Sequence, residues 1–210
     1  MPELTTLIVF AAACFALNAS PGPDMLLIAT RSATQGKSAG LATYLGIATG
    51  AYCHALALAF GLSQLFLAVP GTYDIVRLIG AIYLLYLAWQ SFTSKQPLLQ
   101  QSTGKRRLSF ATLFQQGLLT NLLNPKVALF FLALFPQFIE RQAGSVALQI
   151  LILATVLNIM GLAVNGVVML VASKAGTAIT GNRKTARLTR YITGAVFAGL
   201  AARLAFDTSR

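Results

Sequence analysis

Six apolar runs, each long enough to cross a lipid bilayer, constrain this 210-residue chain more than any other feature. A transmembrane helix needs about 20 consecutive, mainly apolar residues. The polar segments between the runs are short, and the longest extends from about Thr93 to Leu108. Any function must therefore reside in a membrane-embedded helical bundle. The runs cover roughly residues 4–30, 39–62, 74–92, 109–138, 145–172 and 188–206.

The lysines and arginines are distributed unevenly around these runs, which explains the formal net charge of +11. Eleven of them follow the first, third or fifth run, whereas four lie on the opposite side. Because lysine and arginine near the ends of spans stay in the cytoplasm, we expect the loops after these three runs to be cytoplasmic and both termini to be periplasmic. The charge indicates topology, and secondarily attraction to anionic lipid, rather than nucleic-acid binding.

Two of the runs contain proline beside a charged residue. The first has Ser20-Pro21-Gly22-Pro23-Asp24, and the fourth has Asn124-Pro125-Lys126, 102 positions later. Proline removes a backbone donor and clashes with the preceding turn, so both runs should split into half-helices. Irregular backbone and charge are tolerated inside a membrane mainly where they line a cavity or a substrate path. The two motifs therefore indicate a small transporter.

A second pair of matching segments extends this repeat. Gly80-Ala81-Ile82-Tyr83 in the third run matches Gly194-Ala195-Val196-Phe197 in the sixth, although chance similarity between apolar helices is an alternative. Halves of three spans each must enter the bilayer in opposite directions. The sequence thus predicts an all-α integral membrane protein whose six transmembrane helices form two inverted three-helix repeats, with spans one and four broken at the proline motifs. One transporter domain, 1–210, would comprise half-repeats at about 1–94 and 109–210 and a basic cytoplasmic linker at about 95–108.

The aligned charges Asp24 and Lys126 are the leading candidates for a substrate site. The N-terminus of a half-helix suits a carboxylate, and unwound carbonyls suit an ammonium group, so an amino acid zwitterion is complementary to the two breaks. We expect Asp24 to bind or gate at the ammonium, and Lys126 with the Pro125 break to bind the carboxylate. A permanent structural ion pair is the alternative. The other candidates at the breaks are Asn18, Ser20, Pro21, Gly22, Pro23, Asn121 and Asn124.

His54, the only histidine, lies in the middle of the second run. It can relay protons, although a buried, neutral, hydrogen-bonded role is the more common one and Asp24 is the better proton carrier. The sequence contains no cluster of metal ligands and suggests no metal or cofactor. Both cysteines, Cys14 and Cys53, are expected to be buried and unpaired. Gly46 and Gly50 permit close approach of another helix, either within the bundle or in a homodimer.

These residues also carry a family resemblance. Three segments carry it: Asn18-Ala-Ser-Pro-Gly-Pro-Asp24, Gly40 to Gly50, and Asn121-Leu-Leu-Asn-Pro-Lys126 followed by Phe130-Phe131 and Phe135-Pro136. Together they resemble the lysine exporter, or homoserine/threonine exporter, family of bacterial amino-acid efflux proteins. The resemblance covers essentially the whole chain. It implies export of amino acids or close derivatives across the bacterial inner membrane, driven by the proton-motive force. Members differ in substrate, so the resemblance does not name the amino acid.

The acidic residues bear on the charge of the substrate. Asp24 is the only acid well inside a run, and an exporter of cationic amino acids would need a further one. The sequence therefore favours a neutral substrate such as threonine, homoserine or a branched-chain amino acid. Together with the proton-driven export that the resemblance implies, the inverted repeats lead us to expect proton antiport with alternating access. The alternative is a permease for ions, metals or other small metabolites. One histidine and one central acid do not form a catalytic cluster, so we do not expect an enzyme.

Overall fold

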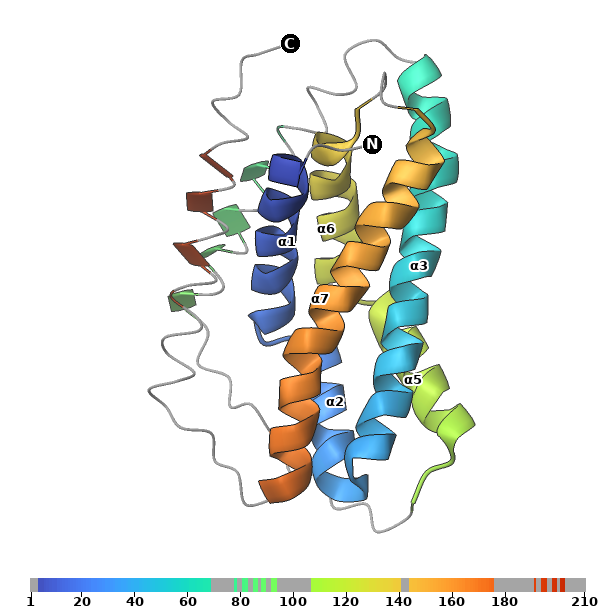
Figure 1. Cartoon of the computed structure of the whole chain (residues 1–210), viewed down its shortest axis with the longest axis vertical. Coiled ribbons are helices and arrows are strands. Elements are labelled where there is room, and N and C mark those ends of the chain that lie inside the picture. Colours follow the sequence, from blue (N-terminus) through green and yellow to red (C-terminus); the bar gives the residue numbers. More distant parts are fainter. Residues whose placement is uncertain are drawn as a thin grey trace.

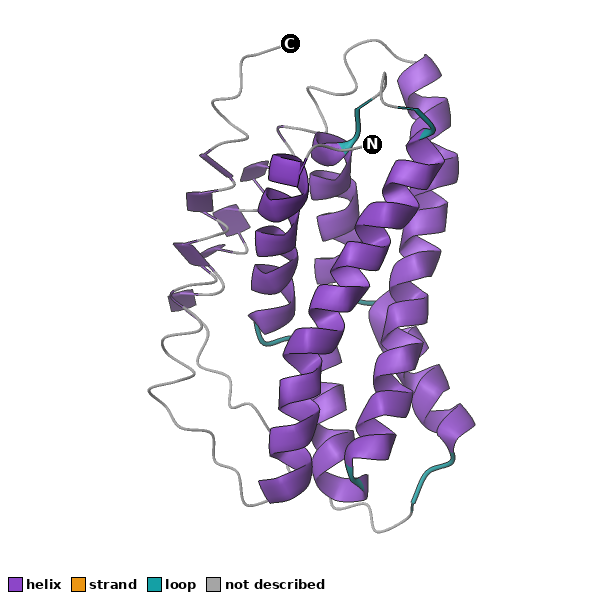
Figure 2. Ribbon diagram, in the orientation of Figure 1, coloured by secondary structure: helices purple, strands orange, loops and turns teal. Residues whose placement is uncertain are grey.

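The computed structural model describes residues 4–68, 107–140 and 144–175, together with isolated helical residues between 78 and 93 and between 191 and 202. Every element in this part of the chain is helical (Figure 2), which confirms the all-α class for the described residues. The elements are α1 (Leu4–Ala19), α2 (Pro23–Gln35), α3 (Lys37–Ala68), α5 (Phe110–Leu122), α6 (Pro125–Leu134), the 3₁₀ helix η1 (Phe135–Phe138) and α7 (Val146–Ala175).

Four of the six predicted spans fall on the described helices. Two are single helices, Lys37–Gly61 within α3 and Val146–Lys174 within α7. Two are bent pairs: α1 meets α2 at 59°, and α5 meets α6 with η1 at 53°. The predicted breaks in spans one and four are therefore confirmed. Spans three and six, and the matching Gly-Ala segments within them, are described only at isolated helical residues, and most of the predicted linker lies outside the described residues.

Each break is organised by the residue types at its centre. Pro23 and Pro125 are the first residues of α2 and α6, a position where the missing N–H of proline costs nothing. Gly22 precedes α2 in an extended conformation, and Asn124 caps α6 by accepting a hydrogen bond from the backbone N–H of Lys126 at 3.1 Å. The prolines thus end one half-helix and begin the next.

Figure 1 shows that the two broken pairs run in opposite directions. The chain descends through α1 and α2, whereas it rises through α5 and α6. The long helices are also antiparallel, because α3 rises and α7 descends. These are the directions that two inverted halves require.

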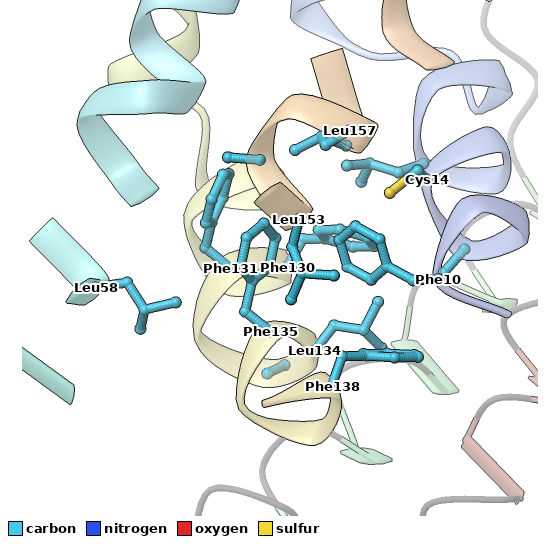
Figure 3. Packing of buried hydrophobic residues seen from close by; sticks show 14 of the residues in the cluster. Phe10, Cys14, Leu58, Phe130, Phe131, Leu134, Phe135, Phe138, Leu153 and Leu157 are labelled. Atoms are coloured by element: carbon cyan, nitrogen blue, oxygen red, sulfur yellow. The ribbon is translucent and has the colours of Figure 1, made fainter. Parts of the chain in front are cut away.

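A cluster of aromatic side chains packs α6 and η1 against α1 (Figure 3). Phe10 makes edge contacts with Phe135 and Phe138, at ring-centroid distances of 5.3 and 5.0 Å. Phe131 stacks on Phe135 at 4.1 Å. Large apolar side chains on the outer surface, such as Phe60 and Ile159, are exposed instead. A bundle with this distribution presents its apolar outer surface to lipid.

Glycines allow α3 and α5 to approach closely. A Cβ atom on Gly46 would collide with the carbonyl oxygen of Phe114, and one on Gly117 would collide with that of Thr43. The predicted small-residue packing is therefore confirmed within the bundle. Cys14 is buried as expected, since it belongs to the apolar core cluster. Cys53 is exposed instead, because it lies on the outer face of α3 with Leu56 and Phe60.

We expect Gly117→Ala to destabilise the protein by about 1–3 kcal/mol, because a methyl group would meet backbone rather than a movable side chain. Thermal unfolding of the purified protein in detergent measures the effect. Gly166→Ala on α7 is the matched control, since a Cβ there has no neighbour within 4 Å among the described residues. Equal melting temperatures for the two variants would contradict this account of the helix contact.

Candidate functional site

A small cavity of about 50 Å³ lies where the two broken spans meet. It is lined by residues from both breaks and from the long helices α3 and α7. The structure brings together on its walls seven of the candidates predicted from sequence, whereas the three prolines shape the breaks without lining the cavity. The seven are Asn18, Ser20, Gly22, Asp24, Asn121, Asn124 and Lys126.

Asp24 ties the start of α2 to the second break. It lies in the first turn of α2, where the helix dipole favours a negative charge. One carboxylate oxygen accepts a hydrogen bond from Asn121 Nδ2 at 2.7 Å, and the other accepts one from Asn124 Nδ2 at 3.1 Å. A single carboxylate therefore holds together α2, the end of α5 and the cap of α6.

Lys126 makes the reciprocal connection to the first break. Its Nζ donates hydrogen bonds to the carbonyl oxygens of Leu17, at 3.0 Å, and Ser20, at 2.9 Å. Carbonyl groups at the end of a helix lack partners within the helix, and the dipole favours a cation there. Gly22 lies beside the lysine, since a Cβ on it would be 3.6 Å from Nζ, an ordinary van der Waals contact. Each half thus supplies the charged side chain that stabilises the break of the other.

Sequence reasoning missed the polar residues that α3 and α7 contribute. The Tyr44 hydroxyl of α3 donates to the carbonyl oxygen of Asn158, and Asn158 Nδ2 donates to the Ala48 carbonyl oxygen at 3.2 Å. Asn165 also lines the cavity and is buried. A signal for the α7 residues was present, because Asn158, Gly161 and Asn165 follow an i, i+3, i+7 spacing on one helix face.

A family model described as "LysE type translocator" matches residues 15–208. The chain belongs to the LysE-type translocator family. It is accordingly a multi-pass membrane protein of a bacterial efflux family, and the family comprises transporters rather than enzymes. The resemblance seen in the proline motifs is confirmed.

Curated relatives of this LysE-type translocator include two named leucine efflux protein, from Salmonella typhimurium (strain LT2) and from Salmonella typhi. Each is 32% identical over 190 residues, which is 88% of this chain and 87% of the relative. An uncharacterised membrane protein of Bacillus subtilis, YrhP, is 33% identical over 148 residues, covering 67% of this chain and 70% of that protein. No solved structure matches the chain.

His54 of the translocator lies behind the cavity wall rather than in it. Its Nε2 is 3.2 Å from the backbone carbonyl oxygen of Asn121, and its ring stacks on Phe131 at 5.6 Å. A hydrogen bond to a carbonyl requires a proton on Nε2, in either the neutral ring or the imidazolium. Asn121 therefore links His54 to Asp24 by hydrogen bonds, because its backbone carbonyl accepts from the ring and its side chain donates to the carboxylate.

The remaining wall of the cavity is apolar. Its residues line the same cavity as the charged groups; they are Leu17, Met25, Ile47, Ala51, Val127 and Leu157. The cavity has room for a few water molecules, but a branched-chain amino acid is several times larger. Binding of such a molecule requires the surrounding half-helices to move apart.

Proposed function

We propose that this translocator exports neutral aliphatic amino acids, with leucine as the first candidate, from the cytoplasm across the bacterial inner membrane in exchange for protons. The observation that carries the proposal is one cavity whose lining includes a carboxylate and an ammonium group, Asp24 and Lys126, together with six apolar side chains. A neutral amino acid has the matching parts. The relatives named leucine efflux protein support the choice of leucine.

In the loaded state, the substrate ammonium binds Asp24, and the substrate carboxylate binds Lys126 and the N-terminus of α6 at the Pro125 break. Lys126 must then release the carbonyl oxygens of Leu17 and Ser20, to which it donates in the structure. Its release removes a link between α1 and α6. Substrate binding is thereby coupled to separation of the two halves.

Six spans, arranged as two inverted three-helix repeats, would rock around this site and expose it alternately to each side. The loops after spans one, three and five face the cytoplasm, and both termini face the periplasm. Asp24 carries the proton. Protonation removes the negative charge of its carboxylate, so the substrate ammonium is no longer attracted and is released. His54 is a second candidate for proton transfer through its contact with Asn121.

The deciding experiment measures efflux from proteoliposomes loaded with labelled leucine, threonine, homoserine or lysine, with and without an imposed proton gradient. We expect gradient-stimulated release of leucine that is at least about tenfold faster than that of lysine, whose second positive charge would be buried without an acid. Protein-free liposomes and collapse of the gradient by an ionophore are the controls. If no amino acid leaves faster than from protein-free liposomes, the amino-acid assignment is wrong.

A further inference from the structure

The side-chain amide of Asn165 has a fixed orientation beside the cavity. The residue is only 4% exposed. Its Nδ2 donates to the carbonyl oxygen of Gly161 at 3.0 Å and to Asn18 Oδ1 at 3.4 Å. A rotated amide would place its oxygen against these two oxygens, so the nitrogen must occupy this side. The oxygen, Oδ1, therefore points away from them.

Asn165 Oδ1 is buried and has no hydrogen-bond partner among the described residues. Buried acceptors without partners are rare in native proteins, and each one calls for an explanation such as a missing ligand or water. Asn121 Oδ1 is a second such atom on the cavity wall. It lies against the backbone of α3, however, because a Cβ on Gly50 would come within 2.7 Å of it. Asn165 is thus the better placed of the two to meet a ligand.

The other amides on the cavity wall show which kind of ligand group is needed. The Nδ2 atoms of Asn121 and Asn124 both donate to Asp24, and that of Asn158 donates to a backbone carbonyl. The Tyr44 hydroxyl also donates to a carbonyl. These donors are engaged within the protein, while an amide oxygen remains without a donor. A cavity with surplus acceptors favours a donor-rich cation such as an ammonium group.

We infer that Asn165 Oδ1 accepts a hydrogen bond from the substrate ammonium and is a substrate-binding residue on α7. This inference rests on the proposed function and extends the site beyond the two proline breaks. It gives the long helix α7 a direct part in recognition. An uncharged acceptor also fits a neutral amino acid, because it adds no negative charge to the one on Asp24.

The test compares three ligands that share the isobutyl group of leucine, using protein purified in detergent. Leucine has both charged groups, 3-methylbutylamine lacks the carboxylate, and 4-methylpentanoate lacks the ammonium. Asn165→Leu and Asn165→Ala both remove the acceptor; leucine fills the space of the amide, whereas alanine leaves it empty. Gln116→Met is the matched control, since Gln116 Oε1 is also buried without a partner among the described residues but does not line the cavity.

We expect the Leu and Ala variants to bind leucine and 3-methylbutylamine about ten- to a hundredfold more weakly. Binding of 4-methylpentanoate should be unchanged in both. The Gln116 control should bind the amine as wild type does. Affinities are measured by ligand-dependent shifts in melting temperature, which also show that each variant is folded.

The inference would be overturned if folded Asn165→Leu or Asn165→Ala protein bound 3-methylbutylamine with wild-type affinity. It would also be overturned if these variants lost affinity for 3-methylbutylamine and for 4-methylpentanoate equally. Failure of the wild-type protein to bind the amine would overturn it too. The proposed function fails by a different result, the absence of gradient-driven leucine release from proteoliposomes. The two failures are therefore distinguishable.

Discussion

Asp24→Asn is expected to abolish gradient-driven leucine export, with a loss in rate of at least about a hundredfold. The substitution barely changes the size of the side chain. The carboxylate accepts from Asn121 and Asn124 at once, but an amide would turn its own NH₂ group toward one of these donors. It would also remove the negative charge that shares the cavity with Lys126. The variant thus loses both the ammonium-binding group and the proton carrier.

Efflux from proteoliposomes, normalised to the amount of folded protein, measures this effect. The double variant Asp24→Asn/Asn121→Asp is the informative control, because it moves the carboxylate across the 2.7 Å hydrogen bond and keeps an amide paired with a carboxylate. We expect it to regain melting temperature without regaining export. Wild-type export by the double variant would show that Asp24 acts as a structural partner and not as a substrate contact.

Lys126→Met should eliminate export and also destabilise the fold more than any other single change at the breaks. Methionine preserves the length of the chain but donates no hydrogen bond to Leu17 or Ser20. Two carbonyl groups at the end of α1 would then be left without this donor inside a membrane-embedded bundle. Removing one partner from a buried charged network costs about 3–5 kcal/mol.

Thermal unfolding in detergent and leucine efflux are measured on the same preparation of this variant. Lys37→Met is the matched control, because Lys37 is exposed at the start of α3, and neither quantity should change in it. A folded Lys126→Met protein with the melting temperature and export of wild type would contradict both roles given to Lys126. Exchange of the two charges is less informative, since an aspartate at position 126 would face the carbonyl oxygens at the end of α1.

The sequence alone was sufficient to place the two breaks and most of the candidate site. Pro23 and Pro125 lack an N–H whatever surrounds them, so their effect on a helix is local and can be predicted without a fold. Asp24 and Lys126 stood out because charge inside an apolar run is costly. Asn18, Ser20, Asn121 and Asn124 followed because they are the polar neighbours of the same prolines.

The partners of these groups were decided only by tertiary structure. Sequence reasoning placed opposite charges at related positions, but it did not show that Asp24 accepts from two asparagines of the other half or that Lys126 donates to the end of α1. Asn165 was missed because a polar residue in an apolar helix can face a cavity or a neighbouring helix, and hydropathy is the same in both cases. Which of these it does depends on how α7 packs against segments more than a hundred residues away, and local chemistry does not encode that packing.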